Sequence, residues 1–140
     1  LPMLMAAEHL AGATHVFVNQ LNENAKTLAE YHIIPELNHH LLEALSHPKT
    51  IRDNLSWISL QSPLYKKENG NRLELTQTTL EEHGLTVTPF ALKETTKLGQ
   101  VFELIMLGTY TAFYLAMLHK VDPGPIPTVD WFKAELKKMS

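Results

Sequence analysis

The stretch NLSWISLQSPLYKKENGNRLELTQTTLEEHGLTVTPFAL, residues 54–92, decides the fold. Its first part, residues 54–61, alternates apolar side chains with serines, which is typical of a half-buried strand. Residues 71–83 carry leucines at helical spacing and are followed by Gly84, a residue common just after a helix end. Residues 85–92 have the pattern of a second strand. A strand, a helix and a strand in this order predict a parallel pair joined by a right-handed crossover, the unit of an α/β fold.

Outside this unit the patterns are helical. Helices are expected over residues 3–30, 36–46, 95–120 and 128–138, with Pro2 at a first-turn position. The predicted order is therefore helix, helix, strand, helix, strand, helix, helix. Two strands are few for a sheet of this kind. We therefore expect further strands upstream of Leu1 or from another subunit.

Composition narrows the possible classes of function. The 140 residues are 44% hydrophobic, which fits one folded domain with a sizeable core. The net charge of −3 gives no support to nucleic-acid binding, which favours a basic surface. The absence of cysteine excludes disulfides and thiolate zinc sites and fits a reducing cytoplasm, where we expect the protein to work. The start at Leu-Pro, with no basic segment before an apolar one, predicts a fragment of a longer protein without a secretory signal.

One segment, residues 101–120, is apolar enough to raise the question of a membrane span. About 18 of its residues are strongly apolar, whereas a spanning helix needs roughly 20. Glu103 also lies among them. We therefore expect a helix buried in a core or in a subunit interface, and no membrane partner.

Residues 19–45, NQLNENAKTLAEYHIIPELNHHLLEAL, are dense in side chains that can carry chemistry. Glu36 and His39 are three residues apart, as in di-metal helical bundles, but such sites need a second Glu-x-x-His copy and further glutamates, so we expect no metal. The sequence has no glycine-rich dinucleotide motif, no P-loop and no Gly-x-Ser-x-Gly elbow. Acid–base chemistry by Glu23 and His39 remains, because a carboxylate and an imidazole can move protons near neutral pH. The alternative is a solvated helix surface, which most polar runs of this kind form.

The motifs of this region resemble those of a known enzyme family. They read QLNENAK over residues 20–26 and PELNHH over residues 35–40, and YLAMLHKVDPGPIPTVDWFKAEL follows over residues 114–136. Together they resemble the C-terminal half of the bifunctional phosphoglucose/phosphomannose isomerases, members of the sugar-isomerase (SIS) superfamily. His40 stands where the family commonly has Asn.

The resemblance implies both a mechanism and its residues. Glu23 would carry a proton between C1 and C2 of the sugar through a cis-enediol(ate). His39 would help to open the sugar ring, acting from one subunit of a homodimer into the site of its partner. Lys133 is the best match to the family's C-terminal lysine, although Lys137 and Lys138 are near. Neither a metal nor a cofactor is implied, and the substrate would be a phosphosugar.

The resemblance also implies a fold and a domain organisation. The fold would be an SIS-like, Rossmann-like α/β sandwich with a parallel sheet flanked by helices, incomplete without upstream strands. Residues 1–140 would be a single C-terminal domain of a protein with two SIS domains. The phosphate-binding loops would lie largely in the preceding half. Two alternatives remain open, a non-catalytic module that binds sugar phosphates and a dimerisation domain.

Overall fold

Four parallel strands form the centre of the computed structural model, which describes residues 1–139. In chain order they are β1 (Pro2–Ala7), β2 (Glu30–Ile34), β3 (Ser56–Gln61) and β4 (Thr86–Ala91), and their spatial order is β2-β1-β3-β4. All three neighbouring pairs are parallel. The predicted α/β class with a parallel sheet flanked by helices is therefore confirmed.

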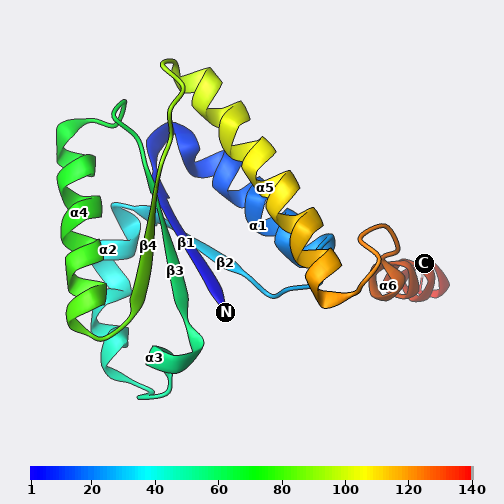
Figure 1. Cartoon of the computed structure of the whole chain (residues 1–140). Coiled ribbons are helices and arrows are strands. Elements are labelled where there is room, and N and C mark those ends of the chain that lie inside the picture. Colours follow the sequence, from blue (N-terminus) through cyan, green and yellow to red (C-terminus); the bar gives the residue numbers. More distant parts are fainter. Residues whose placement is uncertain (140) are drawn as a thin grey trace.

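Helices cover both faces of the sheet (Figure 1). One face carries α1 (Ala11–Glu23) and α5 (Lys97–His119), and the other carries α2 (Glu36–His40) and α4 (Lys67–Glu82). The shorter helices are the 3-10 turns η1 (Glu8–Leu10) and η2 (Leu42–Ser46) and the single turn α3 (Ile51–Asn54). The last helix, α6 (Pro127–Lys138), stands away from the sheet and has no buried residue.

The predicted helix over residues 3–30 is wrong at both ends. Residues 2–7 form the central strand β1, whose last five residues are buried, and α1 begins only at Ala11. A parallel strand covered on both faces reads as a continuous apolar run, which sequence periodicity does not distinguish from a buried helix. Residues 30–34, at the end of the same predicted helix, form β2. Two strands that we expected from outside the chain thus lie within it.

The long apolar helix α5 packs along α1 through a narrow stripe of buried residues. They recur every four residues: Gln100, Leu104, Gly108, Ala112 and Ala116. Length and composition would allow α5 to cross a membrane, and only 22% of its apolar window is buried inside the chain. The expectation of a helix buried in a core therefore holds only for this stripe, because large side chains such as Phe102, Tyr110 and Leu118 remain exposed. Burial of the remaining surface in a subunit interface, the other expectation, stays a prediction.

Gly108 sets the distance between α5 and α1. A Cβ added there would lie 2.2 Å from Oε1 of Gln20 and 2.9 Å from ring atoms of Phe17, which is 2% exposed. Gly108→Val is therefore expected to lower the free energy of unfolding by about 1–3 kcal/mol, as overpacking of a core does. Gly70→Val in α4 is the matched control, because a Cβ there meets nothing within 4 Å. Chemical denaturation of both variants measures the difference, and equal stabilities would contradict close helix packing at Gly108.

His32 gives the domain a pH-dependent stability. Its half-buried ring lies 5.8 Å from that of Trp57 and 6.4 Å from that of His40, measured between centroids. Burial lowers the pKa of His32 below its ordinary value of 6.5, His40 lowers it further, and Glu30 opposes the shift. The folded state thus favours the neutral ring of His32. This contribution to stability is fully present when the pH lies above the pKa of His32 in the unfolded chain, and it is lost as the pH falls through the pKa of His32 in the folded protein.

We therefore expect the melting temperature to fall as the pH is lowered from about 7.5 to about 5.5, and to fall less in the variant His32→Gln. Thermal unfolding followed by circular dichroism at both pH values measures the two decreases. An equal decrease in the variant would show that other groups cause the loss.

Candidate active site

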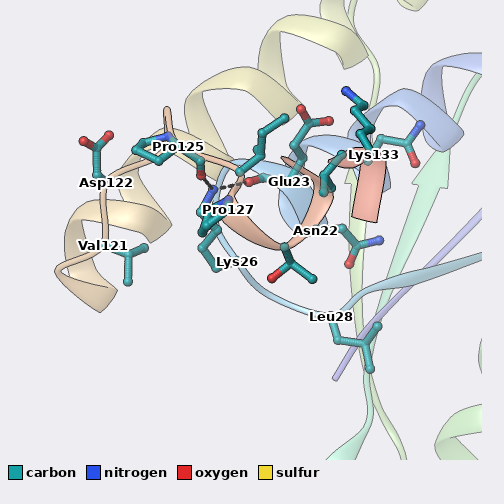
Figure 2. Close-up of a pocket in the computed structure, with 13 residues that line it drawn as sticks. Asn22, Glu23, Lys26, Leu28, Val121, Asp122, Pro125, Pro127 and Lys133 are labelled. Atoms are coloured by element: carbon teal, nitrogen blue, oxygen red, sulfur yellow. Dashed lines mark hydrogen bonds between the residues drawn. The ribbon is translucent and has the colours of Figure 1, made fainter. Parts of the chain in front are cut away.

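A cavity of about 970 Å³ lies beside the C-terminal end of α1 (Figure 2). Its walls are the last turns of α1, the start of the loop that leads to β2, the proline-rich connector after α5 and the first turns of α6. Segments about a hundred residues apart in the sequence therefore meet here. The volume is in the range of sites that bind small metabolites.

Two of the three predicted catalytic residues line this cavity. Glu23 is the last residue of α1, and Lys133 lies in the second turn of α6. Both side chains are exposed, so each can meet a ligand without being uncovered first. The cavity thus places a carboxylate and an ammonium group around one hollow (Figure 2).

The geometry also separates Lys133 from the neighbouring lysines. Lys133 lines the cavity, whereas Lys137 and Lys138 are not part of its wall. Lys138 donates from Nζ to Oε1 of Glu135 on its own helix at 2.7 Å. Of the three lysines that the sequence left as alternatives, Lys133 is thus the one whose side chain lines the cavity.

His39 lies elsewhere in the fold. It is an exposed residue of α2, on the face of the sheet opposite to α1, and it does not line the cavity (Figure 1). The cavity lies at the C-terminal end of α1, which leads into the start of β2, whereas α2 follows the end of β2. One copy of the chain therefore brings Glu23 and Lys133 together but leaves His39 apart.

The polar residues on either side of Glu23 hold its surroundings in place. The Asn22 side chain donates from Nδ2 to the carbonyl of Ala29 at 3.3 Å and accepts from the Ala29 amide at 2.8 Å. Asn24 donates from Nδ2 to the carbonyl of Pro123 at 3.3 Å. Lys26 donates from Nζ to the carbonyls of Glu23 and Pro125, drawn as dashed lines in Figure 2. Sequence reasoning gave these three residues no role, because their partners are main-chain atoms, two of which lie about a hundred residues away.

Comparison with known proteins identifies the family. The sequence model described as the bacterial phospho-glucose isomerase C-terminal SIS domain matches residues 1–136, almost the whole chain. The chain belongs to this family.

Relatives of this SIS domain agree with the assignment. The chain is 28% identical over 134 residues to the bifunctional phosphoglucose/phosphomannose isomerase of Caldicellulosiruptor bescii, covering 93% of this chain and 40% of that protein. It is also 28% identical to the protein of the same name from Aquifex aeolicus, covering 99% and 43%. The SIS domain thus spans about two fifths of the length of these relatives.

Solved structures show the same fold. A glucose-6-phosphate isomerase like protein from Thermus thermophilus superposes with a TM-score of 0.72 at 24% identity. The superposition covers 91% of this SIS domain and 42% of that chain. At this identity the likeness shows the arrangement of strands and helices and nothing further.

A second polar cluster of the SIS domain lies where the strands end. In open α/β sheets this crevice is the usual place for a ligand. Here the Glu8 carboxylate accepts hydrogen bonds from the amide of Lys66 and from Nδ2 of Asn69, both at 2.8 Å, at the start of α4. Burial alone would raise the pKa of Glu8, but the bonds from Asn69 and Lys66 and the charge of Lys97 hold it below its ordinary value. The chain's own carboxylate thus occupies a position where an α/β fold can bind an anion.

The donor set around the cavity does not resemble a metal site. Within residues 1–139 no three His, Asp or Glu side chains gather closely enough to hold a metal ion. The polar groups that line the cavity are two carboxylates, two ammonium groups, two amides and a hydroxyl, those of Glu23, Asp122, Lys26, Lys133, Asn19, Asn22 and Thr128.

Proposed function

We propose that the protein interconverts glucose 6-phosphate or mannose 6-phosphate with fructose 6-phosphate by proton transfer through a cis-enediol(ate). The observation that carries this proposal is the shared cavity, which joins Glu23 and Lys133 from distant parts of the chain. The names of the relatives, bifunctional phosphoglucose/phosphomannose isomerases, supply the substrate class.

Glu23 is the base of the proposed reaction. Its carboxylate takes the proton from C2 of the open-chain aldose phosphate and returns it to C1, while a proton moves from the C2 hydroxyl to the C1 oxygen. The charge that develops on the enediolate oxygen needs a nearby cation, and Lys133 supplies an ammonium group from the α6 wall of the cavity. Both roles use side chains of this chain, so the reaction needs no cofactor.

His39 acts from a second subunit in this proposal. The sugar ring must open before C2 can lose its proton, and an imidazole suits proton transfer to the ring oxygen near neutral pH. The separation of α2 from the cavity within one chain supports a homodimer in which His39 of the partner subunit reaches the cavity.

The remaining parts of the enzyme lie outside this domain in the same proposal. Residues 1–140 form the C-terminal SIS domain, and the preceding half of a two-domain cytoplasmic protein supplies the phosphate-binding loops. This division agrees with the coverage of the relatives and with the carboxylate of Glu8 at the start of α4, which would repel a phosphate.

A second function has one observation in its favour. Large apolar side chains remain exposed along α5 and α6, among them Phe102, Tyr114, Trp131 and Phe132, each at least 59% exposed. Apolar surface of this extent is typical of protein interfaces. A dimerisation domain without catalytic activity would use this surface, but it would give Glu23 and Lys133 at the cavity no function.

The proposed reaction is tested by solvent exchange in the full-length protein. Fructose 6-phosphate is incubated in D₂O, and the aldose phosphates formed are examined by NMR. We expect glucose or mannose 6-phosphate with deuterium at C2, because a protonated carboxylate exchanges with solvent before it returns the proton. Binding of fructose 6-phosphate without any aldose product would instead favour the non-catalytic module.

A further inference from the structure

Lys26 closes the QLNENAK motif, and its backbone adopts an unusual conformation. Its φ is 52°, in the left-handed region that side chains other than glycine rarely adopt. Chains that reverse after a helix generally place Gly or Asn there. A lysine keeps such a backbone conformation only where its surroundings hold it there. The contacts of the Lys26 side chain show what those surroundings are.

The ammonium group of Lys26 bridges two segments. Nζ donates to the carbonyl of Glu23 at 2.7 Å, at the end of α1, and to the carbonyl of Pro125 at 2.6 Å, in the connector between α5 and α6. The carbonyls at a helix C-terminus carry partial negative charge and attract a cation. Charge-assisted bonds of this length are stronger than those between neutral groups.

The connector depends on such donors. Its residues Pro123 and Pro125, like Pro127 at the start of α6, have no N–H group with which to bind the rest of the protein. Two of their carbonyls instead accept hydrogen bonds from side chains at the end of α1, Pro123 from Asn24 and Pro125 from Lys26. Residues 24 and 26, which are two apart in the sequence, thus donate to residues 123 and 125, which are also two apart.

The connector in turn sets the place of Lys133. Helix α6 begins at Pro127, directly after the connector, and none of its residues is buried against the rest of the chain. The two hydrogen bonds of the Lys26 ammonium group form a tether between the connector and the end of α1. Glu23 lies at the α1 end of this tether, because its own carbonyl accepts one of the two bonds. We infer that Lys26 is a positioning residue that holds the Lys133 helix at a fixed place relative to Glu23, and that Asn24 assists it. This inference rests on the proposed function for its effect on catalysis, but not for its effect on structure.

The test compares three variants of the full-length protein. Lys26→Met keeps the length of the side chain and removes the ammonium group, and Lys26→Arg restores donors to both carbonyls. Lys49→Met is the matched control, because Lys49 is exposed and does not line the cavity. In an assay of glucose 6-phosphate isomerisation, we expect Lys26→Met to lower kcat by about 10–100-fold with KM within about twofold, since small misplacements of reacting groups have effects of this size. Lys26→Arg should recover most of the activity, and Lys49→Met should match the wild type.

Hydrogen–deuterium exchange measured by mass spectrometry tests whether the tether holds the connector and α6 in place, and it does not depend on catalytic activity. Lys26→Met should speed exchange in residues 121–138 and leave α4 unchanged, and Lys26→Arg should exchange as the wild type does. Unchanged exchange in Lys26→Met would overturn the inference. So would a higher KM at unchanged kcat, which would indicate that Lys26 binds substrate directly. If the wild type shows no isomerase activity, faster exchange in Lys26→Met still supports the tether, and the proposed function alone fails.

Discussion

Replacing Glu23 by glutamine is expected to lower kcat for isomerisation by about 10²–10⁴-fold, the usual contribution of a general base. Glutamine has nearly the same shape as glutamate but does not accept a proton at neutral pH. The Glu23 side chain is exposed, and the hydrogen bond from Lys26 uses the main-chain carbonyl of Glu23, which the substitution keeps. The end of α1 should therefore stay in place, and KM should change little.

Glu30→Gln is the matched control for this experiment. Glu30 is also exposed, carries the same charge and lies only a few residues further along the chain, at the start of β2, but it does not line the cavity. Its kcat should equal that of the wild type. Deuterium incorporation at C2 should be lost in Glu23→Gln and kept in Glu30→Gln. A kcat within about twofold of wild type in Glu23→Gln would remove Glu23 from the proton transfer.

Mixing two inactive variants is expected to restore activity if His39 serves the site of its partner. Glu23→Gln and His39→Gln homodimers should each be nearly inactive. In a heterodimer, one site receives intact Glu23 from one chain and intact His39 from the other, and the second site lacks both. Random reassembly of equal amounts makes half of the dimers heterodimers with one intact site each, so activity should reach about one quarter of the wild-type value.

The same mixture separates the two possible arrangements. If His39 acted on the cavity of its own chain, each site of the heterodimer would lack one residue and the mixture would stay inactive. Heterodimers can also be made by co-expression with two different affinity tags and purified over both, which removes the homodimers. Every dimer then has one intact site of two, so the activity of this preparation should reach about one half of the wild-type value. Full activity of His39→Gln alone would show that His39 takes no part in ring opening.

The strand–helix–strand unit could be predicted from sequence because its signals are local. Residues 54–61 alternate and Gly84 follows a helical pattern, and the structure has β3 and α4 there with small shifts of their ends. The strand at residues 2–7 could not be read in the same way. Its apolar run fits a buried strand or a helix equally well, and only the neighbours on both sides, β2 and β3, decide between them.

The candidate site was predictable only as separate residues. The motifs point to Glu23 and His39, and the C-terminal pattern points to Lys133, but no sequence pattern states that Glu23 and Lys133 line one cavity while His39 does not. The contacts of Asn24 and Lys26 could not be predicted from the sequence either. Each of these residues binds a main-chain carbonyl about a hundred residues away, and main-chain atoms leave no signature in side-chain identity.

The strand order β2-β1-β3-β4 has a consequence for folding on the ribosome. Of the four strands, the one that is synthesised first is an interior one, and the sheet grows outward from it, to β2 on one side and then to β3 and β4 on the other. Each later strand therefore emerges to find an earlier strand to pair with, and none of these three has to wait for a partner that is still to be translated. Folding that follows synthesis in this way shortens the time for which an unpaired strand edge is open to aggregation.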